Sequence, residues 1–308
     1  MSAAEIIDGA ASLFEPGGPL SAAAMAQARA DPRLPEAIRT LGRGMLAIYR
    51  GNRLLNVLIN DRGRMAIGYL ALYLHDGAAP DGRGSGFGVG QLKAMCAAAG
   101  IASPGRTGAM LTLMRMTGFV ASASAADDRR RHVLVPTEKL REAHRERWSH
   151  MAEALRVIRP DAAAAFALGD PEFEAAYVRH SAEYWLAGLR MIDLAPEMQL
   201  FLDRNGGLMI LLSIILSGDA RESGLPERPI PITISGFSSR FGISRVHVRT
   251  MLRDAEAAGY IARTGEGGSH VVLRPELLEA VRTFFAAVFL YLSHCALLAA
   301  ADARKSRA

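Results

Sequence analysis

One pattern of residues occurs twice in this chain, and it constrains the fold more than any other feature. The matching residues stay about 140 positions apart along most of the chain, and a constant spacing of this kind indicates a duplicated module. Two unrelated helical halves, the alternative, would not keep the spacing constant. The best-matched segments are Gly100-Ile101, Met110-Leu111 and Gly118-Phe119-Val120 in the first copy, and Gly242-Ile243, Met251-Leu252 and Gly259-Tyr260-Ile261 in the second.

The clearest local signal lies in the second copy, at residues 244–258. Ser244 is a natural N-cap, and Gly259 supplies the left-handed residue that ends a helix. Residues 233–242 form a shorter apolar segment with its own cap, just before this helix. Two short helices joined by a tight turn form a helix-turn-helix. The buried face of the second helix is predicted from apolar residues at the helical period: Val248, Met251, Leu252 and Ala255.

Two short strands, Tyr260–Ala262 and His270–Leu273, follow around a glycine-rich tip and predict a β-hairpin. This order of helices and hairpin resembles the winged-helix regulators of transcription. In such proteins the second helix of the helix-turn-helix lies in the DNA major groove, and the hairpin is the wing. The resemblance implies DNA contacts from the outward or flanking residues of helix 244–258 and from the wing, namely Arg245, His247, Arg249, Thr250, Arg253 and Arg263.

The first copy places helices at Gln91–Ala99 and Pro104–Thr117, followed by a wing. Asp128-Arg129-Arg130, the strand Val133–Val135 and Thr137-Glu138-Lys139 then resemble the MarR-like branch of these regulators. In that family the aspartate braces the wing through an arginine, and another arginine reaches the minor groove. The resemblance therefore implies that Asp128 is the brace and that Arg129, Arg130 and Arg131 contact DNA. Pro136 and Leu140 depart from the usual Leu and Gly, and the second copy lacks the triplet.

The two copies differ in the residues that they offer to DNA. The outward face of helix 104–117 carries Gly105, Gly108, Ala109 and Thr112, with only Arg106 and Thr107 nearby to donate hydrogen bonds. This face offers almost no direct base readout. We expect each half to have kept a different part of the DNA-contacting surface.

These signals predict a mainly α fold with small β-wings, arranged as a tandem winged-helix pseudo-dimer with long flanking helices. We expect an N-terminal helical arm at residues 1–30, a first winged-helix repeat at 31–160 and a second at 161–308. MarR-like proteins ordinarily dimerise through their terminal helices. The resemblance therefore implies that one chain imitates the dimer and is a monomer.

Residues 284–301 challenge the expectation of a cytoplasmic protein, because they are long and apolar enough to approach the lower limit of a membrane span. Charged residues precede them on the same predicted helix, at Glu276, Glu279 and Arg282. A helix buried on all sides at the centre of a two-lobed protein has the same composition. We expect the buried helix and no membrane partner.

Composition limits the function further. The net charge of +5 and the pI of about 9.5 are compatible with a polyanionic partner. Two cysteines, Cys96 and Cys295, and an N-terminus without a signal peptide fit the cytoplasm. No H-E-x-x-H or C-x-x-C motif occurs, and the glycine-rich loop at 77–90 lacks phosphate-binding spacing. We therefore expect no enzyme activity and no cofactor.

The sequence thus predicts a sequence-specific, double-stranded-DNA-binding transcriptional regulator. Whether a small-molecule effector exists is left open at this point. The alternative is a protein-interaction scaffold built on winged helices that no longer bind DNA.

Overall fold

The computed structural model describes residues 11–48, 62–77, 86–124, 132–218 and 224–307. It is mainly helical, with two small antiparallel sheets, which confirms the predicted fold class at this level.

The first half begins with a helix of the N-terminal arm and continues through a helix pair and a β-hairpin to a long helix. Its elements are α2 (Ala22–Ala30), α3 (Leu34–Ile48), α5 (Arg62–Leu72), the π-helical turn η1 (Tyr73–Gly77), α6 (Val89–Ala98), α7 (Pro104–Met116), β1 (Val120–Ser124), β2 (His132–Pro136), α8 (Glu138–Ile158) and α9 (Pro160–Ala164).

The second half has no arm, repeats the order of the first half from α3 to α8, and ends in the longest described helix. Its elements are α10 (Pro171–Leu186), the short 3-10 helices η2 (Met191–Leu194) and η3 (Pro196–Met198), α11 (Gln199–Leu202), α12 (Gly207–Ser217), β3 (Ile230–Pro231), α13 (Ile234–Phe241), α14 (Arg245–Ala257), β4 (Ile261–Thr264), the 3-10 turn η4 (Glu266–Gly268), β5 (His270–Leu273) and α15 (Pro275–Arg307).

The two halves agree in detail where the sequences agree. Helices α7 and α14 are both 13 residues long, and each begins after a serine N-cap, Ser103 or Ser244. In each half a backbone N–H after the hairpin donates to the residue before it. Thr137 N–H lies 3.0 Å from the Phe119 carbonyl oxygen, and Arg274 N–H lies 2.9 Å from that of Tyr260. Thr137 directly precedes α8 and Arg274 directly precedes α15, so these bonds align the two helices residue by residue.

A strand segment before each helix pair joins the hairpin, which we did not predict. Phe87 forms an antiparallel bridge with Leu134 of β2, and Ile230 of β3 pairs with Val271 of β5. The second sheet therefore has the order β3-β5-β4, and β2 of the first half receives Phe87 at the equivalent edge. Pairing over such separations depends on tertiary structure, so no local pattern reveals it.

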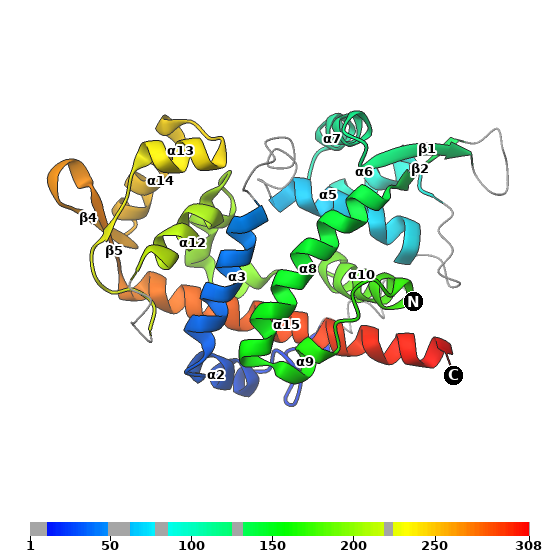
Figure 1. Cartoon of the computed structure of the whole chain (residues 1–308), viewed down its shortest axis with the longest axis horizontal. Coiled ribbons are helices and arrows are strands. Elements are labelled where there is room, and N and C mark those ends of the chain that lie inside the picture. The colour runs from blue at the N-terminus through cyan, green and yellow to red at the C-terminus, as the bar shows by residue number, and fades with distance from the viewer. Residues whose placement is uncertain (1–10, 49–61, 78–85, 125–131, 219–223, 308) are drawn as a thin grey trace.

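The halves pack against each other reciprocally. Within each half, the helix that opens the repeat packs on the long helix that follows the hairpin, α3 on α8 and α10 on α15. Between the halves, α3 packs on α12, and α10 packs on α5 and η1. Figure 1 shows α15 running beneath both halves, with hairpins β1–β2 and β4–β5 at opposite ends of the molecule. One cluster of buried residues, from Leu34 to Ala303, joins both halves. The predicted repeat boundary at residue 160 thus lies within a continuous packing unit and stays a prediction.

Helix α15 is the one described helix that is long and apolar enough to cross a membrane, and 67% of its apolar window is buried inside the protein. A second candidate would arise only if the bent pair 196–202 and 207–217 formed one span. The arm also packs on α15, through Leu13 and Leu20 against Ala287 and Leu290. The burial of α15 at the centre of the fold accounts for its apolar sequence.

One predicted helix was too long. The apolar spacing of residues 172–192 predicts one continuous helix, but α10 ends at Leu186, with Ala187 as its C-cap. Gly188 then adopts φ +97°, a left-handed conformation that favours glycine and turns the chain away. The apolar residues that follow belong to η2.

Candidate nucleic-acid interface

The helix pair α13–α14 is held by one buried face and two local stops. The Ser244 hydroxyl accepts a hydrogen bond from the His247 N–H at 3.1 Å, which caps α14. Gly242, at φ +66°, ends α13 in the left-handed region. The predicted buried residues of α14 are all fully inaccessible, and Phe241 of α13 packs with them in the core. This packing fixes which side of α14 faces outward.

Three arginines lie on the outward side of α14. Arg245, Arg249 and Arg253 are exposed, and Val246 beside them is 68% exposed. The side chains of Arg245 and Arg249 make no hydrogen bond or ion pair with the residues that the structure describes. One helical turn separates them, so their side chains leave the same face. Two guanidinium groups thus remain available to an external partner.

The other predicted contacts of α14 are partly engaged within the protein. His247 Nε2 lies 3.2 Å from the Asn205 carbonyl oxygen, and Thr250 is half-buried. Arg253 lies 3.3 Å from the Asp254 carboxylate. Asp254 also accepts a hydrogen bond from Arg204 at 2.7 Å, which is the main cause of its lowered pKa. The sequence alone could not show these partners, because Asn205 and Arg204 are distant in the chain.

The second hairpin is braced to α14 by Arg263, which we had predicted to contact DNA. Glu256 accepts hydrogen bonds from the Arg263 backbone N–H at 2.9 Å and from its Nε at 2.8 Å. The backbone bond is the main cause of the lowered Glu256 pKa. Arg263 therefore holds strand β4 against the helix. This carboxylate–arginine contact is of the kind predicted for Asp128 in the first half.

Thr107 is not available to DNA. Its side chain is fully buried, and Oγ1 donates to the Ser103 carbonyl oxygen at 3.1 Å. It shares the inner face of α7 with Met110, Leu111 and Met114, which are also buried. The helical spacing from Met110 and Leu111 would have placed Thr107 on this face. Predicting it as a DNA contact was wrong.

The outward face of α7 offers few hydrogen-bond donors. Thr112 Oγ1 donates to the Gly108 carbonyl oxygen at 3.1 Å, and Met116 is 81% exposed. Arg106 is exposed at the first turn and lines a pocket with Asp203, Arg204 and Asn205. The outward face of α7 therefore offers fewer hydrogen-bond donors than the outward face of α14, as the sequence predicted.

Sequence reasoning missed one cation of this face, Lys93 of α6. A Cβ atom on Gly108 would lie 3.1 Å from the Lys93 Nζ, so the lysine side chain crosses α7 at this glycine. The absence of a side chain at position 108 leaves room for it. The predicted wing residues Asp128, Arg129, Arg130 and Arg131 lie outside the described residues.

Within the described part of the chain, no group of three or more His, Cys, Asp or Glu side chains could hold a metal ion. The exposed arginines of α14 are therefore the most distinctive chemical feature of this surface. No protein-family model matches the chain, and no curated protein or solved structure matches it either.

Proposed function

We propose that the protein is a sequence-specific, double-stranded-DNA-binding transcriptional regulator of the cytoplasm. In this proposal the chain consists of two MarR-like winged-helix units, α6–α7 with β1–β2 and α13–α14 with β4–β5. The reciprocal packing of α3, α5, α10 and α12 takes the place of a dimer interface, so that one chain acts as a monomer.

The observation that carries the proposal is the pair of arginines on α14. Arg245 and Arg249 project from an exposed helix that follows a tight turn, and they have no partner among the described residues. An α-helix fits the major groove of B-DNA, where arginine donates two hydrogen bonds to guanine O6 and N7. Unpaired, adjacent arginines on such a helix suit base readout better than a structural role.

The arrangement of the halves supports a common DNA-facing side. Helices α7 and α13 lie along the upper edge in Figure 1, α14 lies just below α13, and the hairpins extend outward at both ends. Lys93, Arg106 and Arg115 give the first half a positive surface with little capacity to read bases. We propose that the second half reads sequence and that the first half, with its wing arginines, contacts phosphates.

A second candidate function is a protein-interaction scaffold, which one observation favours. Met116 is 81% exposed and borders a hollow between α7 and β1, lined also by Val120 and Ala121. An exposed apolar side chain beside a hollow is more typical of protein contact than of DNA contact. The two functions differ in how binding responds to salt.

Binding to labelled genomic fragments at two salt concentrations tests the proposal. If about four phosphates are contacted, affinity should fall roughly a hundredfold between 50 and 200 mM salt, because bound counterions are released. Gel-shift titration of the full chain measures this. The absence of a retarded complex at micromolar protein in 50 mM salt would favour the scaffold.

A further inference from the structure

Residues 185–206 of the second half, called the bridge segment below, contact both helix pairs. The segment runs from the end of α10 through η2, η3 and α11 to the residue before α12. Met198 and Phe201 anchor it in the core that the two halves share, and each is at most 1% exposed. Both η2 and η3 also pack on α15. Because the segment is fixed to the core, the groups that it presents to each helix pair have defined positions.

At one end of the bridge segment, Arg190 binds the C-terminal end of α6 in the first half. Its Nη2 donates to the carbonyl oxygen of Ala99, the C-cap of α6, at 3.0 Å. The last carbonyl groups of a helix lack partners within it and carry partial negative charge, so a guanidinium there is stabilising. Arg190 Nη1 also donates to the Trp185 carbonyl oxygen at 2.5 Å, and the guanidinium lies 5.1 Å from the centre of the Trp185 ring. The second half therefore orients the side chain that reaches the first half.

At the other end, the bridge segment holds α14 at two points. Arg204 Nη2 donates to the Asp254 carboxylate at 2.7 Å. His247 Nε2 lies 3.2 Å from the Asn205 carbonyl oxygen, which can only accept, so the proton of this bond lies on Nε2. His247 and Asp254 are seven residues apart, or about two helical turns. The two contacts therefore fix the direction of α14 as well as its position.

Both ends of the bridge segment line one polar pocket of about 210 Å³. The first half contributes Arg106, from the first turn of α7, and the bridge segment contributes Arg190, Arg204 and Asn205. Figure 1 shows the pairs α6–α7 and α13–α14 separated along the long axis of the molecule. The pocket thus lies between the start of α7 and the residues that hold α14, so one short segment lies against both helix pairs.

We propose that the bridge segment is a spacer that sets the distance between α7 and α14, and that Arg190 is the positioning residue that ties the first helix pair to it. This inference rests on the proposed function and specifies how the two halves share one DNA site. Each base pair inserted between the two contacted DNA segments separates them by about 3.4 Å and rotates them by roughly 35°. A fixed spacer cannot follow that shift, so the protein should accept only one separation.

The distance between the two helices can be measured without DNA. Spin labels on Met116→Cys of α7 and Val246→Cys of α14 occupy positions that are 81% and 68% exposed. The native Cys96 and Cys295 are buried, so labelling should be confined to the two introduced thiols. Pulsed electron paramagnetic resonance of the labelled full chain should give one narrow distance distribution. Adding Arg190→Ala should broaden this distribution.

Two further variants separate loss of the tie from loss of an arginine. Arg204→Ala releases the other end of the bridge segment and should broaden the distribution as well. The matched control is Arg179→Ala, because Arg179 donates to Asp302 at 2.6 Å, within the second half. This control removes a guanidinium and an ion pair without touching either helix pair, so its distribution should stay narrow. Far-UV circular dichroism checks that each variant is folded.

Duplexes with two base pairs inserted between the contacted segments test the consequence for DNA. Fluorescence anisotropy should show that the wild type and Arg179→Ala bind the inserted duplex about tenfold more weakly than the preferred one, since one half loses its contacts. For Arg190→Ala the same ratio should fall to about threefold or less, because its helix pairs move independently. The ratio of two affinities is insensitive to a general loss of charge or of folded protein.

The outcomes distinguish the spacer from the function on which it rests. A broad distribution in the parent, a narrow one in Arg190→Ala, or the wild-type affinity ratio in Arg190→Ala would overturn the spacer and leave DNA binding intact. If the wild type binds neither duplex, the proposed function fails, and the role of the bridge segment in DNA recognition fails with it.

Discussion

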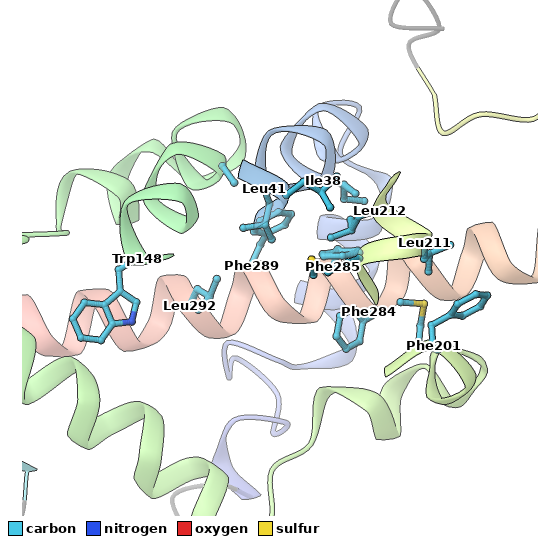
Figure 2. Close-up of a cluster of buried hydrophobic side chains, with 14 of the residues drawn as sticks. Ile38, Leu41, Trp148, Phe201, Leu211, Leu212, Phe284, Phe285, Phe289 and Leu292 are labelled. Atoms are coloured by element: carbon cyan, nitrogen blue, oxygen red, sulfur yellow. The ribbon is translucent and has the colours of Figure 1, made fainter. Parts of the chain in front are cut away.

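Replacing Phe285 with alanine should lower the free energy of unfolding by about 3–5 kcal/mol, as for other fully buried aromatic side chains. Phe285 is 2% exposed, and its ring lies 5.2 Å from that of Phe284 and 6.3 Å from that of Phe289. Figure 2 places it beside Ile38 of α3 and Leu212 of α12. Because α3 belongs to the first half and α12 and α15 to the second, the loss should shift the unfolding of the whole chain. Urea titration, followed by far-UV circular dichroism and by tryptophan emission, measures the free energy of unfolding and shows whether both halves unfold in one transition.

Leu297→Ala is the matched control on the same helix. Leu297 is 40% exposed, so its truncation should change stability by no more than about 0.5 kcal/mol. Two separate unfolding transitions, with Phe285→Ala moving only one of them, would show that the halves do not share a core. Coincident transitions by both probes are the expected result.

The double substitution Arg245→Ala and Arg249→Ala should produce the largest loss of DNA affinity. Each arginine that binds a guanine with two hydrogen bonds contributes about 1–3 kcal/mol of discrimination, so together they account for roughly thirtyfold or more in Kd. Both side chains are exposed, so folding should be unaffected. Fluorescence anisotropy on the preferred duplex and on a scrambled duplex gives the two affinities. The loss should be much greater on the preferred duplex.

Arg304→Ala is the control for the loss of positive charge. Arg304 is exposed near the C-terminal end of α15, at the opposite end of the molecule from α14 in Figure 1. It should lower affinity for both duplexes only slightly. Equal losses on the two duplexes for the double variant would mean that α14 contacts phosphates and does not read bases.

Local signals in the sequence predicted the elements of the candidate interface well. Ser103, Ser244 and Gly259 act within one or two turns of their helices, so caps and apolar spacing located α7 and α14 to within a residue or two. Thr107 shows that residue type alone is not enough to predict a DNA contact. A threonine beside an arginine at the start of a recognition helix was predicted to be a donor, although its spacing from Met110 placed it in the core.

Features that depend on tertiary contacts could not be predicted. The partners of His247 and Asp254 lie 42 and 50 residues away in the chain, and the bridge from Phe87 to Leu134 spans the whole helix pair. A cavity of about 310 Å³ likewise draws its lining from both halves, namely from α5, α8, α10, η2, α11 and α15.

Selection of bound sequences from random duplex DNA tests the central claim most directly, that one chain carries two unequal DNA-contacting halves. The exposed faces of α7 and α14 share no pattern of hydrogen-bond donors, so they cannot recognise identical half-sites. We predict enrichment of a site without two-fold symmetry, with its guanines on the side that α14 contacts. A clean palindrome, or no enriched sequence at all, would contradict the account.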